Sequence, residues 1–221
     1  MEINILSEDK DVIVCVKPPG VLSQCDGQED MPAILRARFG GDIYPVHRLD
    51  RNAGGVMAFA RNARAAASLS SQMQNGQFVK RYLAVVAGIP RPGEGEMTDL
   101  LFRDSRSGRS FVVTRPRKGT REARLSYRTI DAADGRSLVL IRLYTGRTHQ
   151  IRVQFASRGM PLLGDGKYGS RDKGCGMALW SYRLDFMHPT APGVAVGCCY
   201  LPDGGEYPWR LFDLDSLRES G

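Results

Sequence analysis

Short apolar runs that end in turn signals dominate this sequence and limit the folds that it can adopt. The first run, residues 12–16, ends at the Lys-Pro-Pro-Gly string of residues 17–20, which is typical of a turn. Short runs bounded by glycine and proline are typical of strands rather than of helices. The predicted strands are residues 12–16, 43–46, 56–60, 78–87, 111–113, 125–130, 138–143, 178–187 and 194–201.

Helical segments are few and have clear boundaries. We expect a short helix after Asp30, an alanine-rich helix after Asn62, and a third helix that opens at residues 145–148 and stops at Gly159. Because strands and helices do not alternate regularly, the pattern disfavours a doubly wound parallel sheet. It favours an α+β fold on a large, mostly antiparallel mixed sheet flanked by a few helices.

The length and composition favour one globular domain. The chain has 221 residues, of which 42% are hydrophobic, so it is long enough and apolar enough to bury a sizeable core. No repeat, low-complexity tract or linker divides the sequence. We therefore expect a single domain over residues 1–221.

Positive charge is concentrated in one segment. The net charge is +7, and residues 103–128 hold nine basic residues against two acidic ones. Crowding of like charges is unfavourable in a folded chain, so a polyanion is a natural partner for this segment, and its candidate contacts are Arg115, Arg117 and Lys118. A solvated hairpin face explains the same composition, and the sequence leaves both interpretations open.

Several protein classes find no support in the sequence. Residues 1–11 contain acids and no long apolar run, which predicts no signal peptide, and no stretch approaches the roughly 20 apolar residues of a membrane helix. The five cysteines form no CxxC pair, which disfavours a zinc site and fits reduced thiols in the cytoplasm. Phosphate-binding and dinucleotide-binding glycine motifs are missing too. We expect neither a metal nor another cofactor.

The string "YPVHRLDRNAGG", residues 44–55, places Asp50 at the end of a predicted strand. A lone aspartate in a turn is usually a cap or a surface acid. An arginine close to it would hold the carboxylate ionised and aim it. Such a carboxylate suits a nucleophile or a base rather than a proton donor. The residues around Asp50 alone leave a structural and a catalytic role open.

Four blocks, taken in order, give the sequence a family resemblance. They are "VCVKPPGVLS", "VHRLDRNAGGVMAFARN", "KRYLAVVAG", and "LYTGRTHQIRVQF" followed by "PLLGDGKYG". In these blocks the chain resembles the RluA-type pseudouridine synthases over almost its whole length. The Thr-Gly-Arg-Thr-His-Gln-Ile-Arg string is the most specific part. The resemblance implies the catalytic domain of a pseudouridine synthase fold.

The resemblance also implies roles for four residues. Asp50 would be the catalytic aspartate, Arg147 its ion-pair partner, and Tyr82 the ring that stacks on the target base. Arg48 would fill the gap left by the extruded nucleotide or hold a phosphate. Without the resemblance, Tyr82 could be an ordinary strand aromatic and Arg147 a turn residue.

Four neighbouring residues are expected to be structural. His47 and His149 should bond the backbone near the site rather than carry protons. Asp165 and Tyr168 should shape a loop at the rim of the pocket.

The implied activity is the isomerisation of specific uridines in structured ribosomal or transfer RNA to pseudouridine. This reaction needs no cofactor, and the target base must leave the helical stack to react. We expect a cytoplasmic monomer that binds RNA and no membrane. A glycoside hydrolase is a rival class, but it would normally need a second carboxylate near Asp50.

The sequence departs from the family pattern in three places. Residues 53–55 are Ala-Gly-Gly where Thr-Ser-Gly is usual, which predicts a more flexible loop and leaves a catalytically weakened RNA-binding protein as the alternative function. Gln154 stands where a histidine is common. The Lys-Pro block begins at residue 17, so we expect no separate N-terminal RNA-binding domain.

Overall fold

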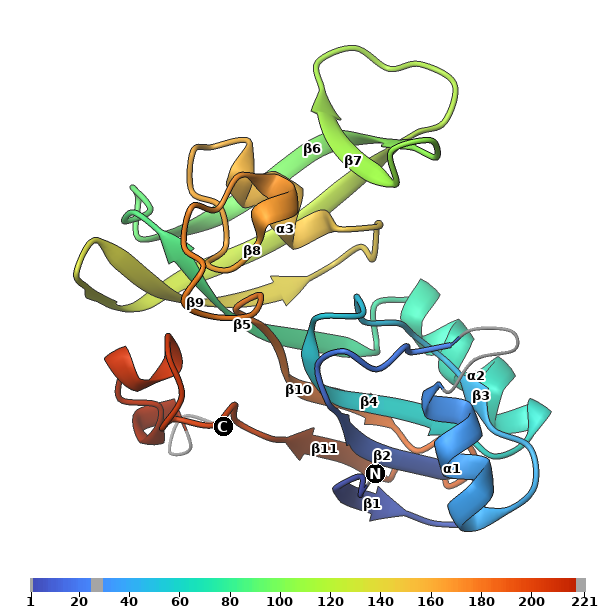
Figure 1. The fold of residues 1–221 in the computed structure, drawn as a ribbon. Helices are drawn as coiled ribbons and strands as arrows, with labels where there is room; N and C mark the ends of the chain where they lie inside the picture. Colours follow the sequence, from blue (N-terminus) through green and yellow to red (C-terminus); the bar gives the residue numbers. More distant parts are fainter. Residues whose placement is uncertain (1, 25–29, 218–221) are drawn as a thin grey trace. The chain divides into compact units, whose positions relative to one another are not determined.

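The computed structural model of the protein describes residues 2–24 and 30–217. The fold is α+β, with a large mixed, mostly antiparallel sheet and three α-helices in the described residues, as the sequence predicts (Figure 1). The chain divides into two compact units, Met1–Arg81 with Trp180–Pro202 and Tyr82–Leu179 with Asp203–Gly221. None of the helices in the described ranges is long and apolar enough to cross a membrane.

The first unit is built on a mixed group of strands. They are β1 (Ile5–Glu8), β2 (Val12–Lys17), β3 (Tyr44–Pro45), β4 (Gly54–Ala60), β10 (Leu179–Met187) and β11 (Ala195–Cys199). Strand β2 pairs with β1 and β4, both antiparallel, and β3 adds to β4. Strand β10 runs parallel to β4 and antiparallel to β11.

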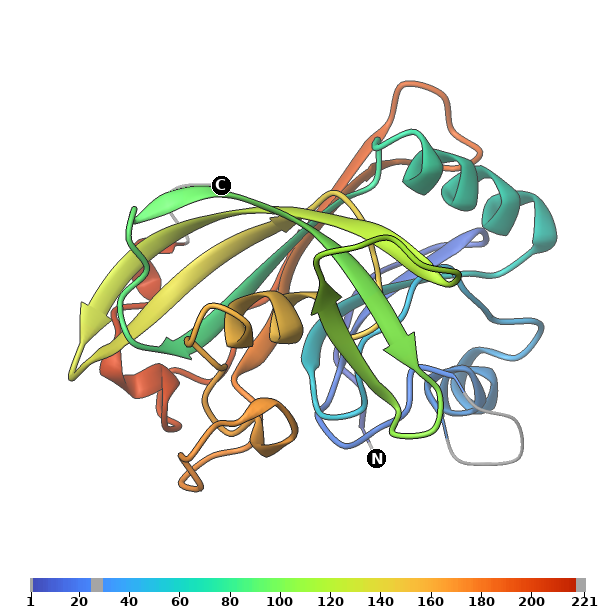
Figure 2. The ribbon, with the colours of Figure 1, turned by 90° about the horizontal axis from the view of Figure 1, so that it is seen from above.

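Two capped helices complete the first unit. Asp30 accepts a hydrogen bond from the amide of Ala33 and starts α1 (Met31–Phe39), and Asn62 does the same for Ala65 at the start of α2 (Ala63–Gln74). Both caps match the sequence prediction. Helix α2 packs against β3 and β4 (Figure 2). Leu69 of α2 packs in one hydrophobic core with Val12, Val14, Val56, Phe78 and Leu184.

The second unit holds five strands, among them the two longest of the described residues, β6 and β8. The strands are β5 (Val79–Ala87), β6 (Glu94–Asp104), β7 (Arg109–Val113), β8 (Thr120–Ala133) and β9 (Arg136–Leu143), in the spatial order β5-β9-β8-β6-β7. Helix α3 (Gln150–Ala156) packs against β6 and β7 (Figure 2). Short 3₁₀ helices follow at Gly166–Tyr168, Trp209–Leu211 and Asp215–Leu217.

The sequence prediction missed strands β1 and β6 and overestimated β3. In β6, Met97 and Leu101 are buried while the acidic Asp99 lies between them on the same face, so the apolar alternation is interrupted. Strand β1 has only four residues and no buried position. The predicted strand at 43–46 shortens to Tyr44–Pro45.

Candidate active site

Asp50 lies in the loop that joins β3 to β4, at the end of the strand-like segment. Its side chain is half-buried, the neighbouring Leu49 is buried, and Arg48 is exposed. The Asp50 carbonyl accepts a hydrogen bond from the amide of Ala53 at 3.0 Å, which closes a tight turn. The loop therefore exposes Arg48 and keeps Asp50 partly shielded from water.

The loop of residues 18–23 holds the Asp50 loop on both sides of the aspartate. The Ser23 hydroxyl donates to the Leu49 carbonyl at 2.8 Å and accepts from the Leu49 amide at 2.9 Å. On the other side, the Gly20 amide donates to the Arg51 carbonyl at 2.8 Å, and the Arg51 Nε donates back to the Gly20 carbonyl at 2.9 Å. The backbone on both sides of Asp50 is thereby fixed.

Lys17 is buried and binds both the loop of residues 18–23 and the Asp50 loop. Its side chain is fully buried, and its Nζ donates to the carbonyls of Pro18, Val21 and Arg51 at 2.9, 2.8 and 3.0 Å. Burial lowers the pKa of Lys17 from 10.5 to about 8, and the attraction of Asp50 opposes part of that fall. The sequence predicted no role for Lys17, although the Lys-Pro-Pro-Gly string marks its position.

The two glycines after Asp50 are not flexible, which corrects the sequence prediction. Gly54 and Gly55 are the first residues of β4, and both are buried and paired with Trp180 and Ser181 of β10. A Cβ on Gly54 would lie 2.3 Å from the Trp180 ring. Gly55 has φ +114°, and a Cβ there would lie 2.2 Å from the Ser181 carbonyl oxygen. Both positions require glycine because β10 passes so close.

His47 bonds the backbone, as the sequence predicts. Its Nε2 accepts a hydrogen bond from the amide of Ala58 at 3.1 Å, and its Nδ1 is buried without a hydrogen-bond partner among the described residues. Burial, together with the positive charge of Lys80, lowers the pKa of His47 to about 3. An imidazole that stays neutral near pH 7 and accepts a hydrogen bond from a β4 amide fits a structural role.

Tyr82 and Arg147 lie in the second unit. Tyr82 is buried in β5, whereas Arg147 is exposed in the turn between β9 and α3. The Gln150 side chain organises this turn, since its Oε1 accepts from the Thr145 hydroxyl at 2.8 Å and from the Arg147 amide at 3.0 Å. The Arg147 Nε donates to the Glu122 carbonyl at 2.8 Å, which fixes the direction of the guanidinium.

The residue that precedes α3 has an unusual backbone. His149 adopts the left-handed conformation, with φ 55° and ψ 27°. Its Nδ1 lies 2.8 Å from the hydroxyl of Tyr168, and the same hydroxyl accepts from the Ser110 amide at 2.8 Å. The Ser110 hydroxyl donates to the Thr148 carbonyl at 2.7 Å. The prediction that Tyr168 shapes a nearby loop fits these contacts, whereas no pattern in the sequence indicated Ser110.

Two buried side chains of α3, Arg152 and Gln154, anchor the helix to neighbouring segments. Arg152 binds Asp165 through two hydrogen bonds of 2.6 and 2.8 Å, and both side chains are buried. Gln154, at the position where the family commonly has histidine, is fully buried, and its Nε2 donates to the Asp99 carboxylate at 2.7 Å. These contacts anchor the helix that follows the Arg147 turn.

The family described as RNA pseudouridylate synthase matches residues 11–157, which include the Asp50 loop, Tyr82 and the Arg147 turn. The chain belongs to this family. It is an RNA pseudouridine synthase, an isomerase that acts on RNA.

Similar proteins come from several bacteria. The chain is 32% identical to the uncharacterized RNA pseudouridine synthase YlyB of Bacillus subtilis, over 100% of this chain and 75% of that protein. It is 36% identical to an uncharacterized RNA pseudouridine synthase of Zymomonas mobilis, over 75% of this chain and 78% of that protein. Among solved structures, the human RNA Pseudouridylate Synthase Domain Containing 1 shares the fold, with a TM-score of 0.80, 24% identity, and coverage of 99% of this chain and 94% of that one.

The basic segment of this pseudouridine synthase runs along β6, β7 and β8. Arg115, Arg117 and Lys118 are all exposed in the loop between β7 and β8, residues 114–119, which we call the basic loop (Figure 1). The Arg117 guanidinium lies 3.7 Å from the centre of the Phe102 ring, a cation–π contact. Exposure fits RNA binding and a solvated hairpin equally, so RNA contact stays a prediction.

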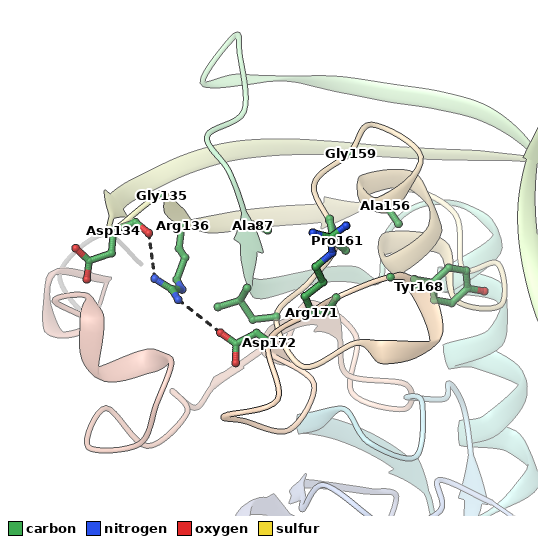
Figure 3. Close-up of a pocket in the computed structure, with 13 residues that line it drawn as sticks. Ala87, Asp134, Gly135, Arg136, Ala156, Gly159, Pro161, Tyr168, Arg171 and Asp172 are labelled. Carbon is green, nitrogen blue, oxygen red and sulfur yellow. Dashed lines mark hydrogen bonds and ion pairs between the residues drawn. The ribbon is translucent and has the colours of Figure 1, made fainter.

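A cavity of about 770 Å³ opens elsewhere in the second unit. Figure 3 shows Arg136 on one side of it, bonded to the Asp134 carbonyl and to Asp172, and Tyr168 on the other side. Of the residues that the sequence analysis singled out, Tyr168 lines this cavity, whereas Asp50, Arg48, Tyr82 and Arg147 do not.

One group of side chains in the described residues has the spacing of metal ligands, namely Asp9, Asp11 and His188. The side chains of this group already form hydrogen bonds with each other and with neighbouring residues. The His188 Nδ1 accepts from the Ala191 amide at 3.0 Å, which leaves the proton on Nε2, where it faces Asp9 at 2.7 Å. In this structure the three side chains therefore take part in a local network of hydrogen bonds.

Proposed function

We propose that Asp50 is the carboxylate that starts the isomerisation, with Arg147 as its ion-pair partner and Tyr82 stacking on the uracil. The observation that carries this proposal is the support of the Asp50 loop. Hydrogen bonds hold the backbone before and after the aspartate, and buried Lys17 attracts its charge. Catalytic groups need such fixed placement, whereas an ordinary surface acid does not.

The chemistry requires one carboxylate and no external reactant. The bond from uracil N1 to the ribose C1′ breaks, the uracil rotates, and C5 bonds to C1′. C5 then loses its proton and N1 gains one, so no electrons are transferred and no water is consumed. Asp50 could attack C1′, add to C6 or remove the C2′ proton. Each route requires an unprotonated carboxylate oxygen.

The substrate we propose is a uridine in structured ribosomal or transfer RNA of the cytoplasm. A stacked base is inaccessible, so the target must flip out at a cost of a few kcal/mol, which basic contacts to the RNA backbone offset. Arg48 is exposed two residues from Asp50 and can fill the gap or hold a phosphate. The basic loop supplies further contacts to phosphates.

The experiment is a pseudouridine map of ribosomal and transfer RNA from cells with and without the gene. At least one pseudouridine should disappear without the gene, return with the wild-type gene and stay absent with Asp50→Asn. If Asp50→Asn restored the modification, Asp50 would not be the catalytic residue. If no pseudouridine changed, the alternative of a catalytically weakened RNA-binding protein would gain support.

A further inference from the structure

The turn that bears Arg147 is attached to a strand far away in the sequence through hydrogen bonds that are buried or partly buried. Ser110 lies in β7, and it is only 2% exposed. Its hydroxyl donates to the Thr148 carbonyl at 2.7 Å, one residue after Arg147. Its amide donates to the Tyr168 hydroxyl, which also contacts His149 Nδ1, at 2.8 Å in each case.

One arrangement of protons satisfies every bond in this chain. The Tyr168 oxygen accepts the Ser110 amide proton, so its own proton is available for the lone pair of His149 Nδ1. A neutral His149 with its proton on Nε2 satisfies this geometry. The phenol therefore joins strand β7 to the residue that ends the turn.

His149, which this network contacts, has a backbone conformation that depends on its surroundings. A left-handed backbone is unfavourable for a side chain such as histidine, and it persists only where the surroundings fix it. Ser110 and Tyr168 supply that support at Thr148 and His149. If the turn relaxed, the direction of Arg147 would change with it.

We propose that Ser110 and Tyr168 are positioning residues for Arg147 and act by fixing the Thr145–His149 turn. This inference rests on the proposed function, in which Arg147 serves catalysis. Ser110 lies in β7, the strand that leads into the basic loop, so the basic loop and the Arg147 turn are both attached to β7.

The matched control is Ser137. Like Ser110, it is fully buried in the second unit and donates one hydrogen bond to a backbone carbonyl, that of Gly88, at 2.8 Å. Ser110→Ala and Ser137→Ala should therefore lower the melting temperature by similar amounts. Tyr168→Phe removes the hydroxyl from the same network and keeps the ring beside Arg109 and Arg152.

Two measurements on the full-length protein test the proposal. Hydrogen exchange of the amides in residues 145–153 should speed up in Ser110→Ala and Tyr168→Phe but not in Ser137→Ala. The turnover number on a substrate RNA should fall about ten-fold in the first two variants, with KM and RNA affinity almost unchanged. In an Arg147→Met background, Ser110→Ala should lower turnover no further.

The outcomes separate this inference from the proposed function. Unchanged exchange in residues 145–153 of Ser110→Ala and Tyr168→Phe would overturn the positioning role, whatever the activity. Faster exchange with wild-type turnover would support the positioning of the turn and would instead remove Arg147 from the catalytic proposal. Equal loss of turnover in Ser137→Ala would reduce the effect to general destabilisation and overturn the inference.

Discussion

Lys17 gives the Asp50 loop a pH dependence that can be measured. The pKa of Lys17 is lowered from 10.5 to about 8 by burial, and one pKa unit corresponds to about 1.4 kcal/mol. Near pH 7 the folded protein therefore holds a buried ammonium at a cost of about 3 kcal/mol relative to the neutral amine. Between pH 8 and 10.5 the unfolded chain binds more protons at this position than the folded chain, so this contribution to stability rises with pH.

Lys17→Met isolates that contribution. The three carbonyls that Lys17 binds lose their donor in the variant, so it should be less stable than the wild type at every pH. Denaturant unfolding should show the difference in unfolding free energy between the two proteins widening by about 2.5 kcal/mol from pH 7 to 10. Lys10→Met, at an exposed lysine, controls for the removal of a charge. A gap that stays constant or narrows with pH would refute a buried, charged Lys17.

Three other sets of substitutions test a close packing contact, the basic loop and Arg147. Gly54→Ala should destabilise the protein by about 1–3 kcal/mol, because its Cβ would meet the Trp180 ring, and Trp180→Phe should remove part of that penalty in a double-mutant cycle. Replacing the three basic residues of the basic loop with glutamine should flatten the log–log salt dependence of RNA affinity, by about 0.7 per lost phosphate contact for single strands, and leave turnover at saturating RNA unchanged. An identical slope would favour the solvated-hairpin interpretation. Arg147→Met should lower turnover severely in single-turnover assays, and a near wild-type rate would exclude the proposed ion pair with Asp50.

Features set by neighbouring residues could be predicted from the sequence. The caps at Asp30 and Asn62 are correct because a capping side chain acts on an amide three residues later. The buried strands β2 and β4 are correct because their apolar runs are continuous. The order of the family blocks also identified the family, because each block contains local backbone requirements and specific side chains.

Features set by distant contacts could not be predicted. Gly54 suggested a flexible loop, yet Trp180 lies against it from the other end of the chain. Lys17 bonds the Arg51 carbonyl across 34 residues, and Ser110 bonds Tyr168 across 58. The sequence did not predict strand β6, because the acidic Asp99 occupies an inward-facing position. Gln154 and Arg158 bind Asp99 there. In each case the partner, rather than the local pattern, determines the role.

The central claim is that the Asp50 carboxylate performs the reaction. The most direct test follows tritium release from a substrate RNA labelled at uridine C5, in a single turnover with enzyme in excess, for wild type, Asp50→Asn and the control Asp42→Asn. Asp42 is an exposed acid just before β3. We predict release by the wild type and by Asp42→Asn, and none above background by Asp50→Asn, which should still bind the RNA with nearly wild-type affinity. Appreciable release by a clean preparation of Asp50→Asn would contradict the account.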